Sequence, residues 1–304
     1  MKIGVIGLGK MGSGILERLH NAGHQAVGFD IDKKSCLAMK KNNFKVAGSI
    51  QDFFAQINIC WVMVPIGDPL EKIMSNIKEY GKKNLIIIEG SNNHFLETRK
   101  YAQIMHSHGF SYLDCGTSGG LKGKDIGFSL MIGGEKSIYE KAIPFFKAVA
   151  GPESYGYVGP SGSGHYVKMV HNGIEYAMLQ SYAEGFHLLK EGSFTKDAID
   201  MSQVTKIWKN RSVIRSWLLE LSHEVFATEK DMENVSGEIN EGGTGLWAAQ
   251  EAKRNNIEVP AIQKSLEVRE WSRKAGGDYS TKIIALLRNK FGGHEVRYKN
   301  KKRS

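Results

Sequence analysis

The 304-residue sequence has only three cysteines and no apolar run long enough to cross a bilayer. Cys36, Cys60 and Cys115 lack the spacing of metal ligands or of a disulfide framework, which is typical of proteins in a reducing compartment. The opening stretch, MKIGVIGLG, continues into glycines and helix formers and not into a signal-peptide cleavage site. These absences predict a cytoplasmic protein with no metal and no membrane partner.

Excess positive charge is concentrated at the C-terminus. The formal net charge is +9, and removing the five charges of the tail 297–304 (RYKNKKRS) leaves +4. A short basic tail is more often solvated than bound to a partner. We therefore expect no nucleic-acid partner, and a mild positive charge also suits a small anionic substrate.

The first half of the sequence alternates short apolar runs with amphipathic segments such as 12–23 and 95–109. Near-continuous apolar strands that alternate with helices indicate a parallel sheet covered on both faces. The expected strands are 2–7, 25–30, 57–65, 84–90, 110–116 and 128–134. We predict an α/β domain over residues 1–160 with a doubly wound parallel sheet of the Rossmann type.

The pattern changes after Pro160. A long helical segment over 164–190 is followed by further helical patterns, interrupted at 241–245, Pro260 and 275–278, with little that resembles a strand. The sequence therefore predicts a long interdomain helix and an all-α domain over 161–304 that ends in the basic tail.

A dinucleotide-binding pattern lies in GLGKMG, where Gly7, Gly9 and Gly12 follow the first expected strand and open a helix. Glycines at this spacing allow a tight turn, close approach of a pyrophosphate and close helix–strand packing. Asp30 ends the second strand, where a carboxylate accepts ribose hydroxyls and repels a 2′-phosphate, although Lys33 and Lys34 offset part of that repulsion. NAD is favoured over NADP, with further contacts expected from Leu8, Lys10, Met11, Val64 and Asn92.

Four polar residues form a stripe on the long helix. Lys168, His171, Asn172 and Glu175 occupy positions i, i+3, i+4 and i+7, with Tyr176 at the border. Such a stripe is expected to line the interdomain cleft, where ligands commonly bind. A solvated face with a Lys–Glu pair and a satisfied polar network in the core are the alternatives that spacing alone leaves open.

Two further segments end strands at the carboxyl edge of the expected sheet, where ligands of open α/β sheets bind. Ser118, Gly119 and Gly120 follow the fifth strand as a small loop rich in hydrogen-bond donors and suited to a carboxylate. Asn92 follows the fourth strand in EGSN. Taken alone, Ser-Gly-Gly indicates only a turn.

Together these segments resemble the 6-phosphogluconate dehydrogenase family, in its short and often NAD-linked form, within the wider β-hydroxyacid dehydrogenases. The matching segments, in the order that the family has, are GLGKMG, IIIEGSN, TSGG, GHYVKMVHNGIEY, GTGLW and RNKFGGH. The resemblance implies oxidative decarboxylation of 6-phosphogluconate to ribulose 5-phosphate and CO₂. It implies Lys168 as general base and Glu175 as the acid that protonates C1, with His171 and Asn172 orienting hydroxyls.

The resemblance also implies how the substrate is held. Ser118, Gly119, Gly120 and Asn92 would meet its carboxylate end and hydroxyls, and the matching phosphate positions are Tyr176, Thr244, Arg269, Arg288 and His294. In the family the RNKFGGH segment reaches a neighbouring subunit's site, which implies a homo-oligomer, either a dimer or a tetramer. Gly242 and Leu246 replace basic residues of the long form, and Ser91 replaces a usual glycine. One phosphate contact is therefore expected to be missing or supplied elsewhere.

Two other functions compete with this interpretation. A β-hydroxyacid dehydrogenase for a small unphosphorylated 3-hydroxy acid would keep Lys168 but need neither Glu175 nor the tail arginine. A non-catalytic dinucleotide sensor or nucleic-acid binder would use the basic tail and would not need the complete polar stripe.

Overall fold

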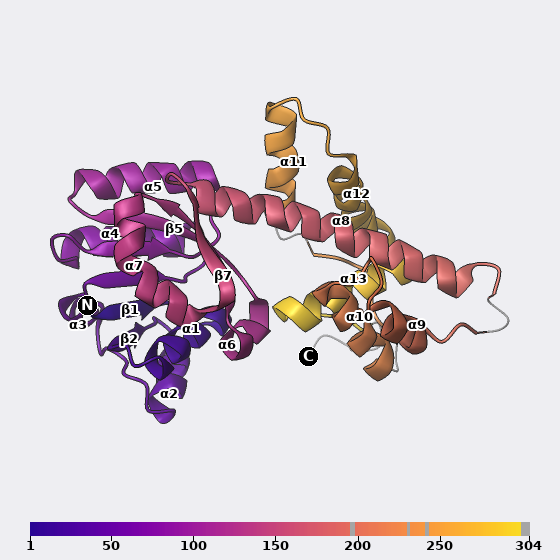
Figure 1. The fold of residues 1–304 in the computed structure, drawn as a ribbon, viewed down its shortest axis with the longest axis horizontal. Helices are drawn as coiled ribbons and strands as arrows, with labels where there is room; N and C mark the ends of the chain where they lie inside the picture. The colour runs from indigo at the N-terminus through magenta and orange to yellow at the C-terminus, as the bar shows by residue number, and fades with distance from the viewer. Residues whose placement is uncertain (195–197, 230–231, 241–242, 299–304) are drawn as a thin grey trace. The chain divides into compact units, whose positions relative to one another are not determined.

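The computed structural model describes residues 1–194, 198–229, 232–240 and 243–298. The chain divides into two compact units, Met1–Met169 and Val170–Ser304, and the division falls within the long helix α8 (Figure 1). Of the sequence features discussed above, Gly242 and tail residues 299–304 lie outside the described residues. No helix in the described ranges is both long and apolar enough to cross a membrane.

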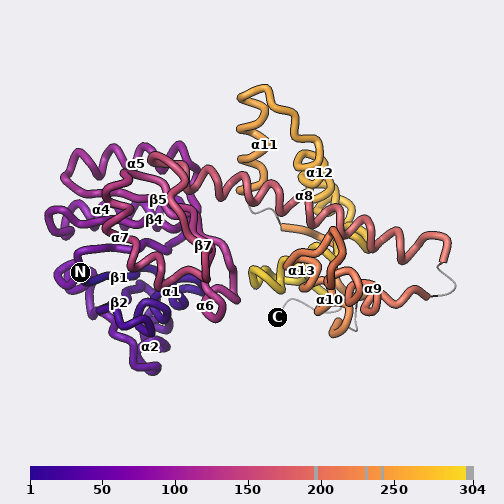
Figure 2. The backbone as a smooth tube through the Cα atoms, viewed as in Figure 1, coloured from indigo at the N-terminus to yellow at the C-terminus, as the bar shows by residue number. Residues whose placement is uncertain are grey.

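The first unit is built on a seven-stranded sheet in the order β2-β1-β3-β4-β5-β6-β7. All neighbouring strands pair in parallel except β5 with β6. β1 and β2, from the indigo start of the chain, lie side by side (Figure 2). The strands are β1 Ile3–Ile6, β2 Ala26–Phe29, β3 Ile59–Val62, β4 Ile86–Glu89, β5 Ser111–Ser118, β6 Phe128–Gly134 and β7 Ala150–Gly159.

Helices cover both faces of this sheet, as the apolar strands predict. One core cluster joins the sheet to α1 and α7, and a second joins it to α3, α4 and α5. The helices of the unit are α1 Lys10–Asn21, α2 Lys33–Lys41, α3 Ile50–Gln56, α4 Asp68–Tyr80, α5 Phe95–Ser107, the short 3₁₀ helix η1 Gly120–Lys122, α6 Gly123–Ile126 and α7 Lys136–Val149. The predicted α/β class with a doubly wound, mostly parallel sheet is confirmed.

Two features of the sheet differ from the sequence-based expectation. β7 was not among the predicted strands, because GPESYG combines glycine, proline and polar residues and most of this edge strand is only half-buried. The antiparallel pairing of β5 with β6 was also missed, because hydrophobic periodicity gives a strand's faces and not its direction.

The described part of the second unit is helical. α8 Ser163–Glu191 contributes Leu179, Ala183 and Phe186 to a core that includes apolar side chains of α10 and α13. A capping box of Asp278 and Thr281 begins α13, and Pro260 begins α12. The remaining helices are α9 Met201–Trp208, α10 Trp217–Thr228, α11 Thr244–Arg254, α12 Pro260–Ala275 and α13 Tyr279–Gly292.

Candidate active site

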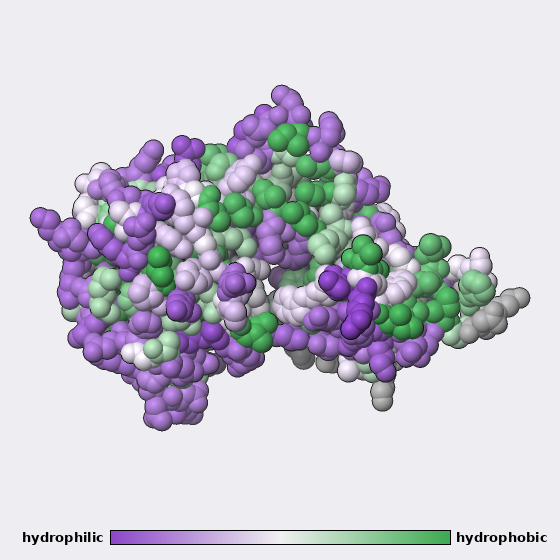
Figure 3. All heavy atoms as spheres, viewed as in Figure 1, coloured by the Kyte–Doolittle hydropathy of each residue, from purple (hydrophilic) through white to green (hydrophobic). Residues whose placement is uncertain are grey.

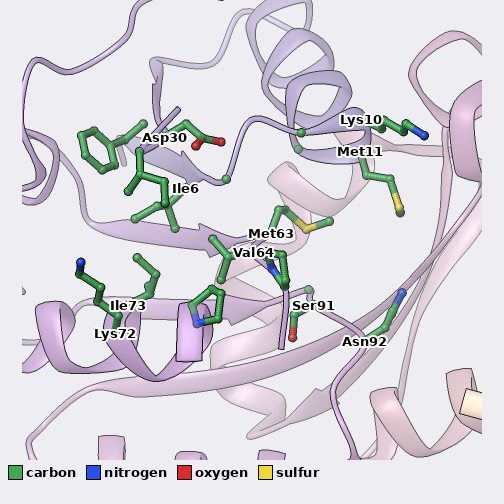
Figure 4. A pocket seen from close by; sticks show the side chains of 18 residues that line it. Ile6, Lys10, Met11, Asp30, Met63, Val64, Lys72, Ile73, Ser91 and Asn92 are labelled. Atoms are coloured by element: carbon green, nitrogen blue, oxygen red, sulfur yellow. The ribbon is translucent and has the colours of Figure 1, made fainter. Parts of the chain in front are cut away.

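A cavity of about 530 Å³ opens above the loop between β1 and α1 (Figure 4). Asp30 and Asn92 lie on opposite sides of it, and their neighbours come from the ends of β1, β3 and β4. This is the carboxyl edge of the sheet, beside the point where strand order reverses, where open α/β sheets bind ligands. Eight of the nine expected cofactor residues line the cavity: Gly7, Gly9, Lys10, Met11, Gly12, Asp30, Val64 and Asn92.

The glycine loop has the geometry that a dinucleotide needs. A Cβ on Gly12 would lie 1.9 Å from the carbonyl oxygen of Gly7, so only glycine allows this packing of α1 on β1. A Cβ on Gly9 would meet nothing within 4 Å, and Gly9 gives α1 no side-chain cap. The N-terminus of α1 therefore suits a pyrophosphate.

The ninth expected residue, Leu8, takes part through its backbone. Its side chain is buried in the core, and its N–H donates to the Asp30 carboxylate at 2.6 Å. Asp30 also accepts from the N–H of Asp32 at 2.8 Å. Lys33 and Lys34 do not line the cavity, whereas Lys72 on α4 does. Sequence reasoning missed Lys72, Pro65 and Pro69, because only the fold brings α4 to this edge.

Asn92 is fixed in place by strand β5. Its side-chain amide donates to the carbonyl of Thr117 at 3.0 Å and accepts from the N–H of Thr117 at 2.8 Å. The backbone of Asn92 is left-handed, with φ 58°, which asparagine tolerates better than most residues. The two hydrogen bonds between Asn92 and Thr117 hold the turn after β4 close to Ser118, the last residue of β5. Gly119 and Gly120, both with positive φ, follow Ser118.

Lys168 lies on α8 against the backbone of β5. Its exposed fraction is 6%, and a Cβ on Gly116 would lie 2.6 Å from the Cβ of Lys168. The helix therefore packs directly on the strand at Gly116, and the side chain of Lys168 begins next to the sheet.

Within the second unit, α8 joins two groups of the expected substrate residues. Asn172 donates to the hydroxyl of Thr244 at 2.8 Å, and its Oδ1 lies 3.0 Å from Nδ1 of His171. One turn further along, the guanidinium carbon of Arg269 lies 3.3 Å from the centre of the Tyr176 ring. Thr244 begins α11 and Arg269 lies on α12, so residues far apart in sequence meet along one helix.

Arg269 and Arg288 form a buried cationic pair. Arg269 is 1% exposed, and its Nη1 and Nη2 atoms lack a hydrogen-bond partner among the described residues. Burial lowers its pKa to about 10, with nearby Arg288 adding to the effect, so it stays charged at neutral pH. Burial also lowers the pKa of Arg288, whose Nη1 donates to the carbonyl of Asn240 at 2.6 Å. Two neighbouring guanidinium groups suit a dianionic phosphate.

Two further expected residues, His294 and Glu175, are less buried than Arg269 and Arg288. His294 is exposed beyond the end of α13, and its ring is perpendicular to that of Phe291. Glu175 is half-buried on α8 and lies close enough to both arginines for its charge to raise their pKa values against burial. Leu246, which replaces a basic residue of the long form, is exposed on α11.

A glycine-rich dinucleotide pocket on a doubly wound sheet, followed by a helical unit with a polar stripe, defines a nicotinamide-dependent dehydrogenase. A family model described as the NAD binding domain of 6-phosphogluconate dehydrogenase matches residues 2–159, and one for the C-terminal domain of that enzyme matches residues 164–282. The chain belongs to the 6-phosphogluconate dehydrogenase family, as the resemblance of its motifs predicted.

Individual relatives agree with this assignment. The chain is 42% identical, over 99% of its own length and 100% of the relative's, to an NAD(+)-dependent, decarboxylating 6-phosphogluconate dehydrogenase of Haloferax volcanii. A solved 6-phosphogluconate dehydrogenase of Plasmodium falciparum superposes with a TM-score of 0.81 at 25% identity, covering 90% of this chain and 62% of that one. A 3-hydroxyisobutyrate dehydrogenase of Mycobacterium tuberculosis gives a TM-score of 0.74 at 20% identity over 94% and 98% of the two chains, which shows a shared fold.

Proposed function

We propose that this protein oxidises and decarboxylates 6-phosphogluconate to ribulose 5-phosphate and CO₂ with NAD. The observation that carries the proposal is the polar stripe of α8, with buried Lys168 at one end and Tyr176 against buried Arg269 at the other. A phosphorylated sugar acid needs a base for its reacting hydroxyl, which Lys168 would supply, and a cation for its phosphate, which Arg269 would supply. The full-length similarity to an NAD-linked decarboxylating relative supports the same substrate.

NAD would be held by the loop Gly7–Gly12, by Asp30 at the ribose and by Val64 and Asn92 further along the cavity. When bound, it supplies the hydride acceptor. The Asp30 carboxylate disfavours the 2′-phosphate of NADP, and Lys33 and Lys34 do not line the cavity to offset it. No group of side chains suited to a metal occurs in the described ranges, and the proposed chemistry uses none.

The chain's own residues would move the protons. Lys168, uncharged, accepts the proton of the substrate's 3-hydroxyl during oxidation. The resulting ketone accepts the electrons that CO₂ leaves behind, and protonated Lys168 returns its proton to that oxygen. Glu175, two turns along α8, then donates a proton to C1 of the enediol, with His171 and Asn172 orienting hydroxyls. Each proton is thereby transferred by a side chain of one helix.

The phosphate would bind Arg269, Arg288, Tyr176 and Thr244, with His294 as a further tail contact, and the carboxylate end would bind Ser118, Gly119, Gly120 and Asn92. The Nη1 and Nη2 atoms of Arg269, which lack a hydrogen-bond partner within the described ranges, support this placement. A small unphosphorylated 3-hydroxy acid has no phosphate to bind Arg269 and Arg288, and a buried cation is costly when its charge is not offset. This comparison favours the phosphorylated substrate over the competing one.

Initial-rate kinetics with 6-phosphogluconate, 3-hydroxyisobutyrate, NAD and NADP test the proposal, with reduced nicotinamide and CO₂ measured together. We expect equal amounts of both products from 6-phosphogluconate and a higher kcat/KM with NAD. Faster oxidation of 3-hydroxyisobutyrate would refute the substrate. Reduction of NAD without CO₂ would refute the decarboxylation.

We further propose a cytoplasmic homo-oligomer in which the C-terminal segment with Arg288 and His294 completes a neighbour's site. Exposed apolar side chains of the second unit support self-association (Figure 3), since large apolar patches commonly mark interfaces. They include Leu188, Phe194, Ile207, Val213 and Ile214. A bound nucleic acid is not part of the proposal, and removal of residues 297–304 is expected to leave turnover intact because Arg288 and His294 remain.

A further inference from the structure

Two buried carboxylates lie side by side where β4 and β5 approach the start of α8. Glu89 and Asp114 are register partners on these parallel strands, and both have an exposed fraction of 0%. Buried carboxylates are costly unless several donors contact them. The hydrogen-bond donors around each carboxylate therefore show which segments that carboxylate connects.

Asp114 holds the first turn of α8. Its Oδ1 accepts from the N–H of Gly162 at 2.7 Å, and its Oδ2 accepts from the N–H of His165 at 3.0 Å. A helix N-terminus has unpaired N–H groups and favours a negative charge. Asp114 thus attaches the helix to the sheet from a strand that lies 48 residues or more away in sequence.

Glu89 joins the same helix to the cofactor cavity. Its Oε1 accepts from both the N–H (2.7 Å) and the hydroxyl of Ser91, which lines the cavity beside Asn92. Its Oε2 lies 3.4 Å from Nδ1 of His165 on α8. The hydroxyl group of Ser91, which replaces a usual glycine, gives this carboxylate an additional donor.

The contacts of His165 fix its tautomer. Nδ1 lies 2.7 Å from Oγ1 of Thr98, whose own hydroxyl donates to the carbonyl of His94 at 3.3 Å. Both neighbours of Nδ1 therefore act as acceptors, so Nδ1 carries a proton directed at Thr98 and Glu89. His165 contacts both carboxylates, Asp114 through its backbone N–H and Glu89 through its ring.

We propose that Glu89 and His165 are positioning residues that set Lys168 relative to the cofactor cavity, an inference that rests on the proposed function. His165 precedes Lys168 by one helical turn, and Glu89 anchors the Ser91–Asn92 turn at the cavity edge. Neither Glu89 nor His165 lines the cavity. Glu89 and His165 would act by fixing the distance between Lys168 and the cofactor cavity. A displacement of about 1 Å between reacting groups can cost on the order of 100-fold in rate.

Three variants separate positioning from general stability. His165→Leu removes the ring donor, His165→Asn keeps an N–H close to the place of Nδ1, and Glu89→Gln keeps shape while removing the charge. We expect His165→Leu and Glu89→Gln to lower kcat by roughly 10- to 100-fold, and to raise KM for 6-phosphogluconate and Kd for NAD by a smaller factor, because Ser91 and Asn92 line the cavity. His165→Asn should recover most of kcat. His108→Leu, at an exposed histidine that follows α5, is the matched control and should have no effect.

Hydrogen exchange gives a readout that does not depend on turnover. In His165→Leu, the amides of 162–169 and 91–93 should exchange faster, while those of β1 and β3 keep the protection of the unaltered protein. Wild-type kcat in His165→Leu, or no recovery in His165→Asn, would overturn the inference. So would a uniform rise in exchange over the whole first unit. If the unaltered protein does not oxidise 6-phosphogluconate, the proposed function fails. The exchange pattern alone then tests whether Glu89 and His165 hold the start of α8 against the Ser91–Asn92 turn.

Discussion

At the scale of single residues, the burial of Lys168 has the most direct chemical consequence. Lys168 is 6% exposed near the start of α8, and the proposed function assigns it the role of general base. Lys168→Met should lower kcat by roughly 10²- to 10⁴-fold, the usual contribution of a general base. The Kd for NAD should not change, because Lys168 does not line the cavity. Stopped-flow reduction of NAD and a binding titration measure the two effects.

The matched control for this substitution is Lys190→Met, at an exposed position near the end of the same helix. We expect wild-type kcat for it. Substantial turnover in Lys168→Met would show that another group takes the proton.

Replacing Arg269 is expected to affect stability and substrate binding differently. Its buried Nη atoms lack a partner among the described residues, and replacing a buried charge by an apolar side chain is often neutral or stabilising. Arg269→Met should therefore leave Tm unchanged or higher, while KM for 6-phosphogluconate rises by about 100-fold through loss of a charge-assisted contact. Lys274→Met, on the exposed side of α12, should change neither quantity. A lower Tm together with an unchanged KM would assign Arg269 a structural role.

At the scale of secondary-structure elements, the contact of α8 with β5 depends on Gly116. A Cβ at this position would lie 2.5 Å from the carbonyl oxygen of Gly164 and 2.6 Å from the Cβ of Lys168, so the helix has to move. Gly116→Ala should lower kcat by roughly 10- to 100-fold through displacement of Lys168, and should lower Tm as well. Gly156→Ala on β7, whose Cβ would meet nothing within 4 Å, is the control for a glycine in a strand. Equal kcat values for the two variants would exclude displacement of Lys168.

At the scale of the whole molecule, mixing of subunits tests whether the C-terminal segment serves a neighbour. Lys168→Met and Arg288→Met are each expected to be inactive alone. If Arg288 acts across subunits, a random mixture of the two variants regains about a quarter of wild-type activity, because half of the dimers are mixed and one of the two sites in each mixed dimer has both residues. Activity after dissociation and reassembly measures this. No recovery would mean that Arg288 serves its own chain, where its charge already acts on Arg269.

The sequence by itself determined the local features of this protein. Apolar runs placed six of the seven strands, the glycine spacing placed the cofactor loop, and helical spacing aligned Lys168 with Glu175. These signals depend on neighbours within one or two turns. For the same reason they could not give the direction of β6 or find the edge strand β7, which is mostly half-buried and contains glycine, proline and polar residues.

Only the tertiary structure decided which distant residues meet. Asn172 and Thr244 are 72 residues apart, and His165 lies 67 residues from Thr98 in sequence. Arg269 reaches the ring of Tyr176 from a different helix. Such contacts depend on how helices and strands pack, which no local pattern encodes. The sequence therefore named the groups proposed to carry the chemistry, whereas packing of α8 on the sheet placed the buried carboxylates Glu89 and Asp114 beside the start of that helix.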